Sequence, residues 1–77
     1  MLPHASHPRP GRYRHYKGNE YFVLAVARHT ETEEELVVYR QLYGDTEALW
    51  VRPRTMFLEE VEYQGVRQPR FAFVAES

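Results

Sequence analysis

The run EYFVLAVARH occupies residues 20–29 and is rich in β-branched and aromatic residues. Both of its faces are apolar, whereas a strand with one face in water would alternate apolar and polar residues. The run therefore predicts the central strand of a sheet, curled so that both faces are partly covered. A helix is the competing interpretation, but the β-forming residues and the turn signals on both sides favour a strand.

Shorter segments with strand character lie on both sides of this run. Residues 12–16 alternate in polarity, and Lys17-Gly18-Asn19 predicts a turn because glycine and asparagine tolerate positive φ. Pro53 ends a later strand because proline has no N–H for the ladder, and residues 54–57 are expected to form a 3₁₀-like turn. The further strands are predicted over residues 36–43, 48–52, 58–63 and 70–74.

Several short strands at near-regular spacing, without a convincing helix, indicate a β-sandwich or a barrel. A chain of 77 residues is too short for a sandwich of seven strands. We therefore expect an all-β fold, a small SH3-like barrel of five or six short strands, whose closure would remove exposed sheet edges. The residues predicted to form its core are Val23, Ala25, Val38, Leu49, Val51, Phe57, Val61 and Phe71.

The N-terminal segment has a different character. Residues 1–10 contain Pro3, Pro8 and Pro10, and they show no apolar periodicity. Proline fixes φ and removes a backbone donor, so this segment is expected to be a disordered or extended tail. One barrel domain is expected over residues 11–77.

The composition argues against several classes of protein. Cysteine is absent, which excludes disulfides and thiolate metal sites, so the six Tyr, four Phe and one Trp must supply the core. No run approaches the roughly 20 apolar residues of a membrane span, and the N-terminus lacks the apolar region of a secretory signal. A cytoplasmic, bacterial-type protein with no membrane partner is therefore expected.

Four blocks of the sequence resemble a known family. They are YRHYKG at residues 13–18, ARHTET at 27–32, LVVYRQLYGD at 36–45, and WVRP at 50–53 followed by Met56-Phe57. In this order they resemble the small bacterial family called domain of unknown function 1653, and the resemblance covers about residues 11–73. It implies an SH3-like β-barrel. It implies no function, so no catalytic residues are carried over from it.

The sequence offers little for catalysis or metal binding. A Gly-x-Ser-x-Gly elbow, a cysteine nucleophile and a glycine-rich phosphate loop are all missing, so we expect no enzyme activity and no cofactor. His15, His29 and Glu31 could form a site of two histidines and one carboxylate. However, His15 and His29 fall at opposite ends of a predicted hairpin, more than about 20 Å apart at about 3.3 Å per residue. We therefore predict no metal site, with His29 capping its strand by hydrogen bonds to the following loop.

Aromatic and guanidinium side chains give the stronger functional signal. Trp50 and Arg52 share one face of a strand, whereas Leu49 and Val51 face the other way and suit the core. Large flat rings beside arginine are typical of recognition surfaces. The alternative is that the only tryptophan fills the core and Arg52 stacks on it. The candidate ligand-binding residues are Tyr39, Tyr43, Trp50, Arg52, Arg28 and Arg40.

These observations predict a non-catalytic binding module for a peptide or protein partner. Single-stranded nucleic acid is the alternative ligand, since residues 1–17 carry four basic side chains and no acidic one, and aromatic rings can stack on bases. The net charge of −1 opposes that alternative. A small metal-binding or enzymatic domain ranks third.

Overall fold

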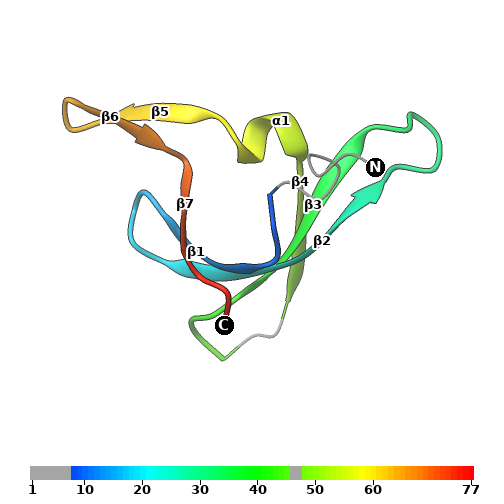
Figure 1. The fold of residues 1–77 in the computed structure, drawn as a ribbon, viewed down its shortest axis with the longest axis horizontal. Coiled ribbons are helices and arrows are strands. Elements are labelled where there is room, and N and C mark those ends of the chain that lie inside the picture. Colours follow the sequence, from blue (N-terminus) through cyan, green and yellow to red (C-terminus); the bar gives the residue numbers. More distant parts are fainter. Residues whose placement is uncertain (1–7, 46–47) are drawn as a thin grey trace.

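The apolar run forms the central strand of a five-stranded antiparallel sheet with the order β4-β3-β2-β1-β7, as its pattern predicts (Figure 1). The structure is a computed structural model that describes residues 8–45 and 48–77. A second sheet consists of the hairpin β5-β6. The elements are β1 (Gly11–His15), β2 (Glu20–Arg28), β3 (Glu35–Gln41), β4 (Leu49–Pro53), α1 (Arg54–Phe57), β5 (Glu60–Tyr63), β6 (Val66–Pro69) and β7 (Phe71–Ala75).

The large sheet curves, and α1 with the β5-β6 hairpin lies across the open side of the curve (Figure 1). An all-β fold is confirmed, but the predicted SH3-like barrel is not, because the two sheets do not close on each other. Residues 54–57 form one turn of α-helix instead of the predicted 3₁₀-like turn, with the Leu58 N–H donating to the Arg54 carbonyl over 3.1 Å. Residues 66–69, which were not expected to be a strand, form β6.

Two local features explain how short segments fit together here. Gln64 (φ 53°) and Gly65 (φ 79°) form a two-residue turn with positive φ at both positions, whose twist suits an antiparallel hairpin and makes β6 possible. At Gly11, β1 approaches the end of β7 so closely that a Cβ would lie 2.7 Å from the Ala75 carbonyl oxygen. Any other residue there would push the two strands apart.

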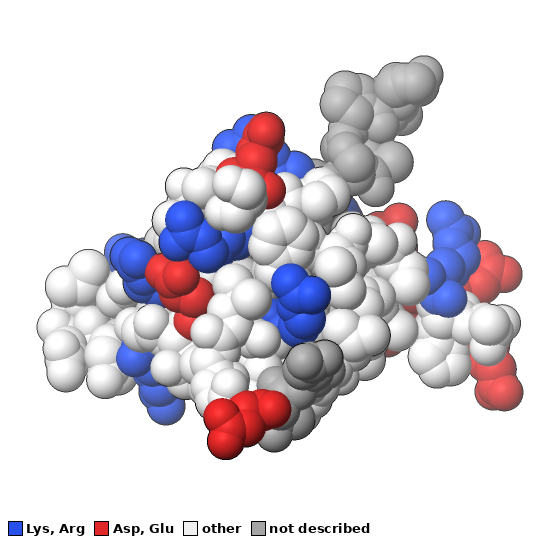
Figure 2. Space-filling view, turned by 90° about the horizontal axis from the view of Figure 1, so that it is seen from below, with Lys and Arg blue, Asp and Glu red and all other residues white. Residues whose placement is uncertain are grey.

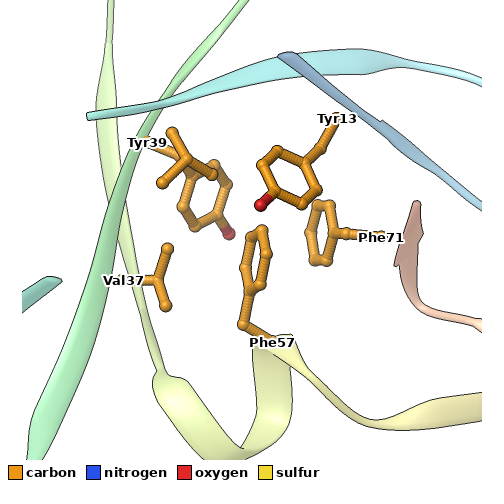
Figure 3. Close-up of a cluster of buried hydrophobic side chains, with 6 residues drawn as sticks. Tyr13, Val37, Tyr39, Phe57 and Phe71 are labelled. Atoms are coloured by element: carbon orange, nitrogen blue, oxygen red, sulfur yellow. The ribbon is translucent and has the colours of Figure 1, made fainter. Parts of the chain in front are cut away.

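The core lies between the concave face of the large sheet and α1. Its buried members are Tyr13, Val23, Val37, Tyr39, Phe57 and Phe71. Phe57 points from α1 toward the sheet (Figure 3), and its ring stacks on Phe71 with centroids 4.1 Å apart. The Tyr13 ring meets Phe57 edge-on at 5.5 Å. The predictions of Val23, Phe57 and Phe71 as core residues are therefore confirmed.

The other five predicted core residues are not buried. Leu49 and Val51 are each 60% exposed. The reason is the register of β4, which pairs Trp50 with Tyr39 and Arg52 with Val37, so that these two residues face the core side and their neighbours face outward. On β4 the predicted faces are thus inverted.

The prediction of Ala25 as a core residue is wrong because of a bulge in β2. The pairing of β2 with β3 shifts between Val23 and Ala25, so Val26 packs against the core while Ala25 is exposed. Val38 and Val61 are half-buried. On β3 it is Val37 that enters the core, because side chains alternate between the two faces of a strand.

The last residues of the predicted tail pack on the domain. Pro8 is buried, the guanidinium carbon of Arg9 lies 3.7 Å from the centroid of the Phe73 ring, and the Tyr13 hydroxyl donates to the Arg9 carbonyl over 2.8 Å. Residues 1–7 of that tail lie outside the described residues. The part of the chain that contributes to packing thus begins by residue 8, ahead of the predicted boundary at residue 11.

We expect Phe57→Ala to destabilise the fold by about 3–5 kcal/mol, because it removes a buried ring from the centre of the core. Val51→Ala, on the exposed face of β4, should change the free energy of unfolding by no more than about 0.5 kcal/mol. Urea unfolding followed by circular dichroism measures both. Equal losses for the two variants would contradict the orientation of β4.

Truncation tests the packing of residues 8–10. A chain that starts at Gly11 loses the Arg9–Phe73 contact and the Tyr13 hydrogen bond, so we expect it to be about 1–2 kcal/mol less stable than the full chain. A chain that starts at Pro8 should stay within about 0.5 kcal/mol of the full chain. Thermal and urea unfolding compare the three proteins. A chain from Gly11 that is as stable as the full chain would show that these contacts contribute nothing.

Candidate functional site

Aromatic side chains continue from the core to the surface along β2, β3 and β4. Tyr21 is half-buried, and its ring centroid lies 5.3 Å from that of buried Tyr39 and 5.5 Å from that of exposed Tyr43. The hydroxyls of Tyr21 and Tyr43 are 3.0 Å apart. Burial, with a further contribution from the Tyr43 hydroxyl, raises the pKa of Tyr21 to about 12, so its phenol stays protonated in neutral solution.

Trp50 extends this surface. Its side chain lies on the same face of the sheet as Tyr39, but it is 48% exposed and is therefore not part of the buried core. The indole N–H donates to the Gln41 side-chain oxygen over 2.8 Å, and the Gln41 amide nitrogen donates to the Tyr43 carbonyl. These bonds fix the orientation of the ring. We call the surface formed by Tyr21, Tyr43 and Trp50 the aromatic rim.

Arg52 borders the aromatic rim and is half-buried. Its Nε donates to the Tyr39 hydroxyl over 3.2 Å, and its guanidinium carbon lies 5.5 Å from the centroid of the Phe71 ring. Within residues 8–45 and 48–77, no carboxylate forms an ion pair with Arg52. The positive charge is therefore held by aromatic groups and is not neutralised by a described neighbour.

His15 also contacts Phe71, with the two ring centroids 4.9 Å apart. Burial lowers the pKa of His15, and the positive charges of Arg52, Arg70 and Lys17 lower it further. We call these four residues the basic cluster. Sequence reasoning considered His15 only as a metal ligand. The alternation along β1, which places His15 on the same face as Tyr13, could have indicated its position beside the core.

A groove with a volume of about 390 Å³ borders the basic cluster at His15. It lies between β1, β6 and β7, and β7 is an edge strand of the large sheet. Its lining combines polar and apolar side chains: Arg14, His15, Tyr16, Gln68, Pro69, Ala72, Phe73 and Val74. The groove thus adjoins His15 at the edge of the large sheet.

The structure brings only part of the predicted site together. Tyr43 and Trp50 are linked through Gln41, and Arg52 lies on the Trp50 face of β4 with Tyr39 buried beneath it. Arg28 lies away from them in the β2–β3 hairpin, where its side chain is 3.7 Å from the Glu33 carboxylate. Arg40 pairs with Leu49 on the outer face, and its guanidinium carbon is 5.8 Å from the Phe22 ring centroid. Tyr21, which sequence reasoning did not include, connects Tyr39 to Tyr43.

His29 has the structural role that the sequence predicts. Its Nδ1 accepts hydrogen bonds from the N–H groups of Glu31 and Thr32, at 3.1 and 3.3 Å, and so closes the loop after β2. His15 lies near the opposite end of β2. In the part of the chain that the structure describes, no three potential ligands among His, Asp and Glu are grouped as a metal site would require. None of the described helical segments has the length and apolar character of a membrane span.

Comparison with known proteins gives two matches. Residues 11–73 match the family model described as protein of unknown function, DUF1653. A solved crystal structure of a DUF1653 protein from Bordetella bronchiseptica is similar at 43% sequence identity, with a TM-score of 0.83 and coverage of 90% of each chain. No curated protein matches.

Replacing Trp50 measures how much the aromatic rim contributes to stability. Because nearly half of the side chain is exposed, we expect Trp50→Ala to cost about 1–2 kcal/mol, less than the about 3–5 kcal/mol typical of a buried ring. The wild-type tryptophan emission should be red-shifted, as for a ring in contact with water. Urea unfolding and fluorescence test this. A blue-shifted emission together with an unfolded variant would place Trp50 in the core.

Proposed function

Because the chain belongs to the DUF1653 family of proteins of unknown function, we propose its function from its own surface: it is a non-catalytic module that binds an extended peptide segment of a partner protein. The observation that supports this most is the aromatic rim. Trp50 and Tyr43 are 48% and 38% exposed, and Arg52 lies beside them without an acidic partner among the described residues. Trp, Tyr and Arg are the residues most enriched at binding hot spots.

The geometry of the rim suits recognition of a ligand. The hydrogen bonds from Trp50 to Gln41 and between Tyr21 and Tyr43 hold the rings before any ligand arrives. Less conformational entropy is then lost on binding, which favours affinity. The groove beside His15 offers about 390 Å³ for further residues of an extended chain.

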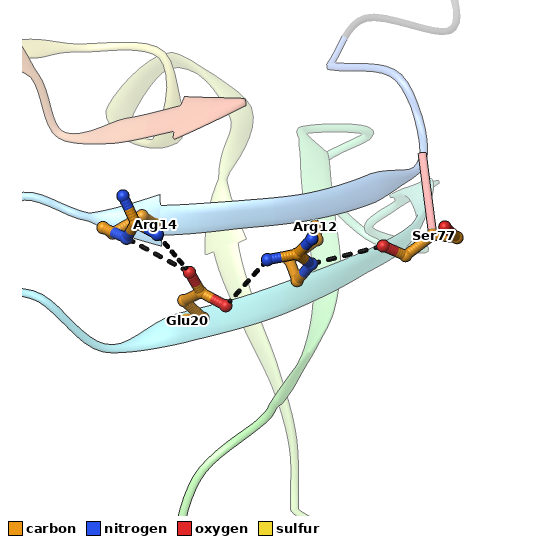
Figure 4. Close-up of polar contacts among 4 residues, drawn as sticks. All are labelled: Arg12, Arg14, Glu20 and Ser77. Atoms are coloured by element: carbon orange, nitrogen blue, oxygen red, sulfur yellow. Dashed lines mark hydrogen bonds and ion pairs between the residues drawn. The ribbon is translucent and has the colours of Figure 1, made fainter. Parts of the chain in front are cut away.

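Single-stranded nucleic acid remains the alternative ligand, and the charges of β1 and β2 argue against it. The side chains of Arg12 and Arg14 both bind the Glu20 carboxylate, at 3.2 and 2.7 Å, and Arg12 also donates to the Ser77 carbonyl (Figure 4). The hydrogen bonds from Arg14 and then Arg12 lower the pKa of Glu20, so it stays charged. Figure 2 shows basic and acidic side chains side by side on one face of the molecule, without a continuous basic track.

Selection from a phage-displayed library of random twelve-residue peptides tests the proposal. We expect the wild-type protein to enrich a defined set of peptides, and synthetic fluorescent copies should bind Trp50→Ala at least about tenfold more weakly, as for a hot-spot residue. Leu49→Ala is the matched control, since Leu49 is the preceding residue on the opposite face of the same strand. Fluorescence anisotropy gives the dissociation constants.

Three outcomes would contradict this function. The first is that no peptide is enriched. The second is that the selected peptides bind Trp50→Ala as tightly as they bind the wild type. The third is that a fluorescent oligo(dT) binds through Trp50 whereas the peptides do not, which would support the nucleic-acid alternative.

A further inference from the structure

We propose that the basic cluster anchors a carboxylate of the bound peptide, from an Asp or Glu side chain, with Arg52 as the main contact. This inference rests on the proposed function and specifies the chemistry of the ligand. The ligand is then an extended segment with an acidic residue at Arg52 and apolar or aromatic residues over the aromatic rim.

Arg52 has terminal N–H groups available for a ligand. Its Nε is occupied by the Tyr39 hydroxyl, while its terminal nitrogens have no hydrogen-bond partner among the described residues. The guanidinium lies 5.5 Å from the Phe71 ring, and Tyr39 beneath it is 4% exposed, so the head group is partly desolvated and fixed in place. A planar guanidinium with free terminal N–H groups matches the two oxygens of a carboxylate.

The surface around Arg52 carries further positive charges. Among the described residues, neither Arg52 nor Lys17 forms an ion pair, and their positive charges lower the pKa of His15 together with that of Arg70. Glu59 binds one terminal nitrogen of Arg70 at 2.9 Å, but the buried Arg70 Nε has no hydrogen-bond partner among the described residues. In a chain with a net charge of −1, this local positive excess favours an anion at one place on the surface.

The arrangement of the basic residues distinguishes a carboxylate from a nucleic-acid strand. A nucleic-acid strand needs a row of cations that follows its phosphates. Arg12 and Arg14 of β1 are bound to Glu20 and lie on the other face of the strand from Tyr13, so they do not extend the cluster. The cluster therefore suits a single anionic group next to apolar surface, which an acidic residue of a peptide provides.

The test uses the peptides selected on the wild-type protein. We expect them to share an Asp or Glu, and replacing that residue by Asn or Gln should weaken binding to the wild type about 10–100-fold, as for a lost charge-assisted hydrogen bond. Arg52→Gln should bind the acidic and the neutral peptide with equal affinity, at the weaker level. Arg40→Gln, which changes an exposed arginine on the outer face, is the matched control and should behave like the wild type.

A second variant of Arg52 tests whether the effect of Arg52→Gln comes from the lost contact or from unfolding. Arg52→Lys keeps the charge but removes the planar fork, so we expect its preference for the acidic peptide to lie between that of the wild type and that of Arg52→Gln. Circular dichroism melting checks that each variant is folded. For the wild type, raising NaCl should weaken binding of the acidic peptide and leave the neutral peptide almost unchanged.

The outcomes separate this inference from the proposed function. Peptides that depend on Trp50 but show no acidic preference, or that bind Arg52→Gln and the wild type equally, would overturn the carboxylate site and leave the peptide-binding function standing. If no peptide binds, both are wrong. If oligo(dT) binds through Arg52 and no peptide does, both are replaced by nucleic-acid binding.

Discussion

The stacking contact between Phe57 and Phe71 joins α1 to β7 at the centre of the core. Phe57 belongs to the single turn of α1 and Phe71 begins β7, so their stacked rings connect the end of the β4 segment to the last strand of the sheet. Tyr13 and Tyr39 pack against the same pair from β1 and β3. The chain has no cysteine and therefore no disulfide bond. A small domain of this kind depends on such ring contacts to bury enough apolar surface.

The same rings also place the candidate site. Phe71 contacts both Arg52 and His15, while the Tyr39 hydroxyl accepts a hydrogen bond from Arg52. The residues of the candidate site thus pack directly on core residues. A substitution beneath it would change both the stability of the domain and the position of Arg52.

The sequence predicts the elements better than it predicts which way they face. The central position of β2, the capping role of His29 and the burial of Phe57 all follow from local patterns, and the structure confirms them. The bulge between Val23 and Ala25 lies within residues 21–27, which are all apolar or aromatic, so the pattern holds no sign of it. On β4, Leu49 and Val51 are apolar like core residues, but pairing with Tyr39 and Val37 turns Trp50 and Arg52 inward instead. A shift of one residue exchanges the two faces of a strand, and only the neighbouring strands decide it.

The position of β1 between β2 and β7 has a consequence for folding of the chain during synthesis. One edge of β1 pairs with the next strand in sequence, but its other edge pairs with residues 71–75. The Arg12 side chain even reaches the Ser77 carbonyl. Such pairing between distant segments closes a long loop and is slow to form. During synthesis on the ribosome the β1–β2 hairpin can form early. The other edge of β1 stays unpaired, and the Tyr13 side chain stays uncovered, until β7 has been synthesised. Until then the nascent domain presents an unpaired strand edge, which is the surface that chaperones and other nascent chains contact.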